Sequence, residues 1–166
     1  TMLGAKIHNV DMGQAMAVVA DFIQRDGLHQ VITLNAEILY QAQTNARLLE
    51  IIQKADLVTP DGSGIVWGAN YLGTPLKDRV SGIDLLWEIC RQAPEKQWRI
   101  YLLGAAPGIA QKAADNLKSK YPHIQIVGVR NGYFDGNAPS QVEEILADIE
   151  KAAPHVLFVA MGAPRQ

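Results

Sequence analysis

The stretch Arg99-Ile-Tyr-Leu-Leu-Gly-Ala-Ala-Pro-Gly108 is a short β-rich run that ends in a loop of glycine, alanine and proline. The residues after it, 108–120, have the apolar spacing of a helix. A strand, a tight loop and a helix in this order form the unit that builds a parallel sheet. This stretch therefore predicts an α/β fold.

The same alternation extends in both directions along the chain. It predicts a Rossmann-like, open, mostly parallel sheet with helices on both faces, within a single domain over residues 1–166. At two helix starts, Ser140 with Glu143 and Ser81 with Asp84 fit capping pairs. We expect strands at 4–9, 30–34, 57–59, 99–103, 124–129 and 155–160, and helices at 14–25, 36–54, 64–71, 83–92, 108–120 and 142–152.

Composition excludes several classes of protein. With 48% hydrophobic and 19% charged residues, the chain has enough apolar material for a core, so disorder is a poor interpretation. The net charge of -2 comes from well-mixed acids and bases, which argues against a nucleic-acid partner. The sequence contains neither an apolar run long enough to span a bilayer nor the pattern of a signal peptide, so we expect a cytoplasmic protein.

The single cysteine and the last residues each carry an expectation. Cys90 cannot form an internal disulfide, and its apolar neighbours indicate a structural role. The apolar run Val156-Leu-Phe-Val-Ala160 leads into Met-Gly-Ala-Pro-Arg-Gln with no helix to cover it. We therefore expect the sequence to be an incomplete domain, cut within a βα unit. Its exposed sheet edge, together with an apolar helix at 83–90, is compatible with self-association.

Asp61 is the strongest candidate for chemistry, because it lies in the loop Thr59-Pro-Asp-Gly-Ser-Gly64 at the carboxyl end of a predicted strand. Ligands bind at this end of an open parallel sheet. A carboxylate held between Pro60 and the flexible glycines has the character of a general base. An equally good local interpretation is that Asp61 caps the helix that begins near Gly64.

Other loops offer polar groups to a ligand. The Gly104–Gly108 loop either receives a diphosphate on its backbone N–H groups or is an ordinary strand-to-helix turn. Arg79 carries guanidinium donors that suit phosphate, although most surface arginines are merely solvated. Thr33, Asn35 and Gln166 offer hydroxyl or amide groups, which serve equally well to satisfy the loop backbone.

Metal chemistry has little support in the sequence. The four histidines, at 8, 29, 123 and 155, are isolated from one another and from carboxylates at ligand spacing. There is no Asp-x-Asp pair of the kind that holds a divalent ion at a sugar-nucleotide diphosphate. We therefore expect no metal and no cofactor, with protein donors neutralising any diphosphate.

Taken in order, the loops form a series. The motifs are Thr-Leu-Asn-Ala-Glu, Pro-Asp-Gly-Ser-Gly, Arg-Val-Ser-Gly-Ile-Asp, Leu-Leu-Gly-Ala, Asn-Gly-Tyr-Phe and Met-Gly-Ala-Pro-Arg-Gln. This ordered set resembles the WecG/TagA/CpsF glycosyltransferase family over residues 4–166. The resemblance implies inverting, metal-independent transfer of N-acetylmannosamine from UDP to the 4-hydroxyl of N-acetylglucosamine on undecaprenyl diphosphate, in cell-surface polymer synthesis. It also implies that the full-length protein works at the inner face of the plasma membrane.

The resemblance also implies residue roles. Asp61 matches the general base, and Arg79 and Gln166 match positions that steady the leaving diphosphate. Thr33 and Asn35 match the polar loop that faces the sugar-nucleotide, with Thr33 counted among the catalytic group. The implied substrate contacts at neighbouring strand ends are Ser63, Gly64, Gly104, Ala105 and Tyr133. In relatives, a further carboxyl-terminal stretch completes the sheet and adds a basic appendage associated with membrane binding.

Three alternatives stay open on the sequence alone. One is a glucosyl- or other hexosyltransferase of the same family, because donor choice rests on a few pocket contacts. Another is a non-catalytic module that binds nucleotide-sugar. A nicotinamide-dependent oxidoreductase fits poorly, because after Gly62 and Gly64 the next glycine, Gly68, falls one position late for the dinucleotide fingerprint.

Overall fold

The computed structural model describes residues 1–163 and divides the chain into two compact units. Unit 1 is Thr1–Glu88 and unit 2 is Ile89–Gln166, so the boundary falls within helix α5 (Gly82–Lys96). Among the described residues there are seven helices and five strands, and each unit contains one small parallel sheet. These elements confirm the predicted α/β class.

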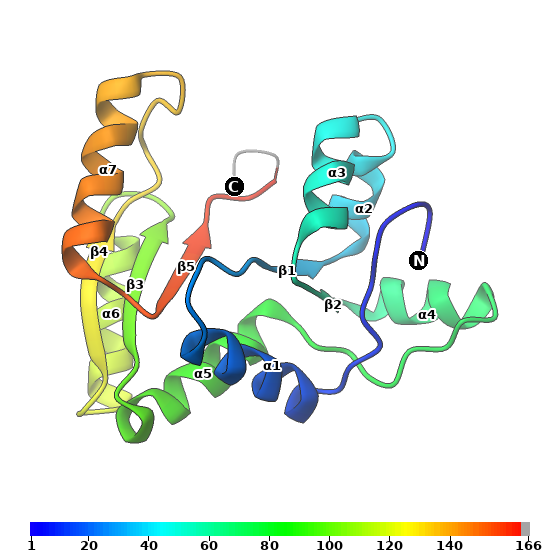
Figure 1. Cartoon of the computed structure of the whole chain (residues 1–166), viewed down its shortest axis with the longest axis horizontal. Helices are drawn as coiled ribbons and strands as arrows, with labels where there is room; N and C mark the ends of the chain where they lie inside the picture. Colours follow the sequence, from blue (N-terminus) through cyan, green and yellow to red (C-terminus); the bar gives the residue numbers. More distant parts are fainter. Residues whose placement is uncertain (164–166) are drawn as a thin grey trace. The chain divides into compact units, whose positions relative to one another are not determined.

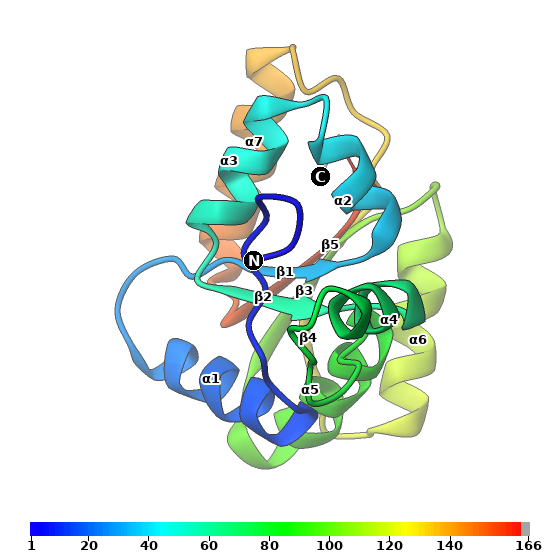
Figure 2. The ribbon, with the colours of Figure 1, turned by 90° about the vertical axis from the view of Figure 1, so that its right-hand side faces the viewer.

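In unit 1, strand β1 (Val31–Leu34) pairs in parallel with β2 (Leu57–Pro60), and Thr33 lies opposite Thr59. Helices α2 (Ala36–Ala42) and α3 (Ala46–Lys54) lie on one side of this pair and α1 (Met12–Gln24) on the other, as Figures 1 and 2 show. The core joins Leu34 and Val58 of the strands to Ile52 of α3 and Ile65 of α4 (Ser63–Tyr71). Because β2 is buried along its whole length, it holds the residues after it firmly.

In unit 2, the central strand β3 (Arg99–Gly104) pairs in parallel with β4 (Gln125–Arg130) and β5 (Val156–Ala160). Tyr101 and Leu103 point to one face and pack against Ile145 of α7 (Pro139–Ala152). Helix α6 (Ile109–Lys120) covers the other face (Figures 1 and 2). The carboxyl ends of all three strands meet at one edge, which is the edge where ligands bind in open parallel sheets.

Two predicted elements were wrong. Residues 4–9 do not form a strand; only an isolated bridge joins Met2 to Ala5. The helix predicted over 36–54 is divided into α2 and α3, because the Asn45 side chain accepts a hydrogen bond from the N–H of Leu48 at 3.1 Å and starts a new helix. An apolar spacing that continued across Asn45 concealed this break.

Helix starts gave one confirmed capping prediction and one that was wrong. The Ser81 hydroxyl accepts from the N–H of Asp84 at 3.2 Å, as expected. At α7, however, the cap residue is Ala138 without a side-chain bond, and Pro139 occupies the first turn. Proline suits this position because its fixed φ fits a helix and it has no N–H to satisfy, so Ser140 falls inside the helix and caps nothing.

One histidine in each unit binds a strand through both its backbone and its ring. His8 donates its N–H to the carbonyl of Val58, and its Nδ1 accepts from the Val58 N–H at 2.8 Å. His155 does the same with Arg99, with a ring contact of 3.0 Å. Burial is the main cause that lowers the pKa of both imidazoles, with Lys6 and Arg99 adding to it respectively. Both rings thus favour the neutral form, which alone can accept a hydrogen bond.

Cys90 is fully buried, and this burial raises its thiol pKa to about 11, which fits the structural role expected from the sequence. Across residues 1–163, no helix is both long and apolar enough to cross a membrane. Within the same range, no three side chains of His, Cys, Asp or Glu gather in a way that would hold a metal ion.

Candidate functional site

Asp61 follows directly after β2, and its carboxylate bonds to a residue distant in sequence. Its Oδ2 accepts a hydrogen bond from the N–H of Gly82, the first residue of α5, at 3.1 Å. Helix α4 instead begins after Gly62, with φ of 90° and no side-chain cap. The predicted capping of α4 by Asp61 was therefore wrong, because the carboxylate faces a different helix.

Backbone bonds explain why residues 80–82 lie beside Asp61. The N–H of Val80 donates to the carbonyl of Pro60 at 2.8 Å, and the Thr59 hydroxyl donates to the carbonyl of Val80 at 3.0 Å. Val80 and Thr59 are both fully buried. The start of α5 is thus fixed to the end of β2, and the distance between Asp61 and Gly82 depends on buried contacts rather than on a loose loop.

Thr33, near the end of β1, reaches the same place. A Cβ built on Gly82 would come within 2.9 Å of the Thr33 hydroxyl oxygen, so this hydroxyl lies directly against the glycine. Gly82 therefore contacts both Thr33 and Asp61. The structure brings these two predicted residues together, although they are far apart in sequence.

Arg79 lies just before this segment and is held by an acidic partner. Its guanidinium Nη2 is 2.9 Å from Oδ2 of Asp84, and the Ser81 hydroxyl donates to the same oxygen at 2.5 Å. The side chains of Arg79 and Asp84 are both about half exposed. Asp84 thus orients the guanidinium while leaving part of it open to solvent, which suits an anion-binding group.

The remaining predicted residues of unit 1 have simple structural places. The Asn35 side chain accepts from the N–H of Ile38 at 2.9 Å and so caps α2. Ser63 and Gly64 are the first two residues of α4, and both are exposed. The contacts of these residues with substrate stay predictions.

Unit 2 has a hollow of about 220 Å³ at the carboxyl edge of its sheet. The turn that lines it is tight: the N–H of Ala105 donates to the carbonyl of Ala160, and the N–H of Gly132 donates to the carbonyl of Ala105, both at 2.9 Å. Tyr133, at its rim, is 72% exposed. The lining residues are Ala105, Ala106, Gly132, Tyr133, Ala160 and Met161.

Gly104 and Ala105 both have backbone conformations that side chains resist. Ala105 adopts a φ of 57° and Gly104 a φ of 138°. A Cβ on Gly104 would lie 2.3 Å from the carbonyl oxygen of Ala160, so only glycine fits there. This close approach of β3 to β5 shapes the floor of the hollow next to the start of α6.

Two groups that contact Asp61 and Arg79 were not predicted from the sequence, and one predicted residue lies outside the described residues. The N–H group of Gly82 was missed because a contact between strand end and helix start leaves no sequence signal. Asp84 was taken only as a capping partner, although its position in Arg-Val-Ser-Gly-Ile-Asp could have suggested an ion pair with Arg79. Gln166 lies outside the described residues, so its predicted role stays a prediction.

Comparison with known proteins supplies independent evidence. The Glycosyl transferase WecG/TagA/CpsF family matches residues 1–166. A Bacillus spizizenii protein named N-acetylglucosaminyldiphosphoundecaprenol N-acetyl-beta-D-mannosaminyltransferase is 32% identical over 136 residues, covering 82% of this chain and 51% of that protein. A Staphylococcus aureus protein of the same name is 30% identical over 167 residues, covering 99% of this chain and 64% of its own length. The chain thus spans about half to two-thirds of these relatives.

Proposed function

Because this chain belongs to the WecG/TagA/CpsF glycosyltransferase family, we propose that it transfers N-acetylmannosamine from UDP to N-acetylglucosamine on undecaprenyl diphosphate. The names of the two relatives supply both the sugar and the acceptor class. The observation that carries the proposal is the Asp61 carboxylate, which the N–H of Gly82 holds beside Thr33. A carboxylate of fixed orientation at the carboxyl end of a strand supports the assignment of Asp61 as general base.

The proposed chemistry begins at Asp61. One N–H donor leaves lone pairs on the carboxylate free to accept the proton of the acceptor 4-hydroxyl. As that proton leaves, the hydroxyl oxygen forms a bond to the anomeric carbon of the donor sugar, and the bond from that carbon to the UDP oxygen breaks. Attack from the face opposite the leaving group inverts the anomeric configuration.

The leaving UDP carries additional negative charge, which donors must stabilise. Arg79 is the proposed group, because Asp84 already orients its guanidinium and half of its surface is open. Gln166 is assigned the same task from the family pattern. Asp84 acts as a positioning residue, and no divalent ion is needed in this scheme.

The hollow of unit 2 is assigned to the nucleotide. Gly104 and Ala105 bring the backbone close to a ligand near the start of α6, and the exposed Tyr133 ring offers a flat face to a base or sugar. Thr33, Asn35, Ser63 and Gly64 of unit 1 are assigned to positioning the transferred sugar. Asn35 would do this in addition to capping α2.

Two measurements test the proposal. Titration with UDP, UDP-sugars and NAD should show binding of UDP and its sugars only, and binding of NAD instead would overturn the proposal. With a soluble lipid-diphosphate acceptor analogue, Asp61→Asn should lower turnover at least about 100-fold with little change in UDP affinity. The control Asp21→Asn removes a surface carboxylate paired with Arg25 and should leave turnover unchanged.

Three other results of these measurements would change the proposal. Retained transfer by Asp61→Asn would eliminate the general-base assignment. Nucleotide binding without turnover in every longer form of the protein would support the non-catalytic module. Faster transfer from UDP-glucose than from UDP-N-acetylmannosamine would identify a different hexosyltransferase of the same family.

A further inference from the structure

Residues 62–76, Gly-Ser-Gly-Ile-Val-Trp-Gly-Ala-Asn-Tyr-Leu-Gly-Thr-Pro-Leu, form the longest stretch of the chain without a charged residue. They include the whole of α4 and the turn after it. A solvent-facing helix of a globular protein ordinarily carries charges on its outer face. The absence of charge over an exposed helix therefore needs an explanation.

The outer face of α4 carries two large aromatic side chains. Trp67 is 69% exposed and Tyr71 is 79% exposed, and their rings stack with centroids 5.6 Å apart. Leu72, the next residue, is also exposed. We call these three residues the aromatic face. Because the rings already hold each other in place, docking them against a partner loses little side-chain entropy.

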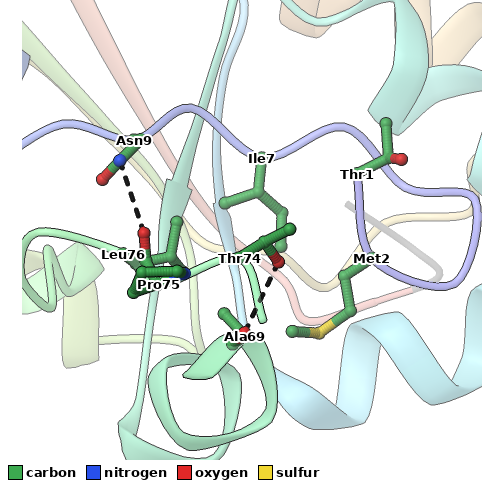
Figure 3. Close-up of a pocket in the computed structure, with 8 residues that line it drawn as sticks. All are labelled: Thr1, Met2, Ile7, Asn9, Ala69, Thr74, Pro75 and Leu76. Atoms are coloured by element: carbon green, nitrogen blue, oxygen red, sulfur yellow. Dashed lines mark hydrogen bonds between the residues drawn. The ribbon is translucent and has the colours of Figure 1, made fainter. Parts of the chain in front are cut away.

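A hollow of about 330 Å³ opens beside the same uncharged stretch (Figure 3). Ala69, Thr74, Pro75 and Leu76 of the stretch contribute to its wall, together with Met2, Ile7, Asn9 and Thr1. None of the predicted site residues lines it. Ala69 is buried and lies two residues after Trp67, on roughly the opposite side of the helix, so the hollow is separate from the aromatic face and contributes nothing to it.

The size of the aromatic face favours a membrane over a second protein. Its two aromatic rings bury roughly 300–500 Å² between them, at about 150–250 Å² each, and the smaller Leu72 adds less than either ring. A stable protein interface needs roughly 800 Å² from each partner. Trp and Tyr, in contrast, are enriched at the boundary between lipid headgroups and hydrocarbon, and the strength of binding there scales with the apolar area that is buried.

The position of α4 next to the proposed base strengthens this argument. The helix begins two residues after Asp61 and, with nine residues, is about 13 Å long. In the proposed reaction, a sugar and a diphosphate separate the attacking hydroxyl from the lipid, a length of the same order. A base that serves a bilayer-anchored acceptor therefore needs a lipid-contacting surface about one short helix away.

We propose that the aromatic face of α4 docks on the surface of a lipid bilayer, with Trp67 and Tyr71 as interfacial anchors. The inference rests on the proposed function for its choice of a lipid partner. Binding is apolar in origin, so it persists on uncharged phosphatidylcholine vesicles and at high salt. It needs neither donor nor acceptor sugar.

Co-sedimentation of this chain with phosphatidylcholine vesicles tests the proposal. The double variant Trp67→Ser, Tyr71→Ser should bind at least about tenfold more weakly than the unaltered chain. The matched control is Tyr40→Ser on α2, which removes an aromatic ring of the same 79% exposure and should bind normally. A second measurement uses the milder substitution Trp67→Phe, which perturbs folding less. Brominated lipid should quench the tryptophan fluorescence of the unaltered chain, and Trp67→Phe should largely abolish this quenching.

Several results would overturn the docking surface. They are an unaltered chain that does not sediment with vesicles, a double variant that still binds, an equal loss in Tyr40→Ser, and binding restricted to anionic lipid at low salt. A double variant that changes only the sedimentation coefficient of the free protein would assign the face to self-association. Vesicle binding is measured without any transferase reaction. A failure to bind vesicles therefore does not contradict the proposed transferase activity, and a lack of transferase activity does not affect the binding measurement.

Discussion

The two units place different chemistry at the carboxyl edges of similar parallel sheets. In unit 1 the edge carries Asp61, Arg79 and Asp84, and each of these charged groups is bonded to another residue of the unit. In unit 2 the described residues that line the hollow are alanine, glycine, tyrosine and methionine, and backbone hydrogen bonds shape it. Charged side chains thus distinguish the edge of unit 1, and backbone shape distinguishes the edge of unit 2; under the proposed function, the first would serve the reaction and the second recognition.

The largest expected effect is on the charged edge. Arg79→Ala should lower turnover about 100- to 1000-fold, because it removes a preorganised donor to the leaving diphosphate. The matched control, Arg25→Ala, removes an exposed arginine that is also paired with an aspartate and should leave turnover unchanged. Steady-state kinetics with the soluble acceptor would measure both. Equal rates for Arg79→Ala and the parent would break the assignment of charge chemistry to unit 1.

The next effect concerns the backbone of unit 2. Gly104→Ala places a Cβ 2.3 Å from the carbonyl of Ala160 at a φ of 138°, and should cost about 3 kcal/mol of unfolding free energy or more. Gly136→Ala, where a Cβ meets open space, should change stability little. Urea denaturation of both variants gives the comparison. If Gly104→Ala had the same unfolding free energy as the parent, the backbone conformation at this edge would not depend on the glycine.

A smaller effect is expected at the rim of the hollow. Tyr133→Ala should weaken UDP binding about tenfold, within the usual range for loss of a stacked aromatic ring. Turnover at saturating donor should change little, because Tyr133 supplies no charge to the reaction. Calorimetric titration with UDP and kinetics with saturating donor separate the two quantities. A fall in turnover without a loss of affinity would contradict the division between the units.

The smallest effect is shared by both units. His8 and His155 have lowered pKa values, so their neutral rings stabilise the fold above the ordinary histidine pKa of about 6.5. This stability is lost as the pH falls through the lowered values, because a protonated ring cannot accept the strand N–H. The melting temperature should drop by a few degrees between pH 7 and pH 5. Replacing both histidines with glutamine should flatten that dependence, and an unchanged slope would show that carboxylates dominate instead.

The sequence predicted most of the elements and only part of the site. Apolar runs such as Arg99–Leu103 are buried strands because their composition alone favours burial. The break at Asn45 was missed because one side-chain cap outweighs a continuing apolar pattern. The ordered motifs predicted roles for Asp61, Thr33 and Arg79, and these roles stay predictions. The hydrogen bond from Gly82 to Asp61 had no such signal, because it joins residues 21 positions apart and depends on tertiary packing.

Gly82 has a consequence for how this site can evolve. Its N–H holds Asp61, and the missing side chain leaves room for the Thr33 hydroxyl, so one position restricts two others. A mutation that adds a side chain at 82 would bring its Cβ to 2.9 Å from the Thr33 hydroxyl oxygen, so the residue at 33 would have to give way next to the backbone that holds Asp61. We expect positions 33, 61 and 82 to be inherited together among descendants that keep the proposed activity, and to vary more freely once it is lost.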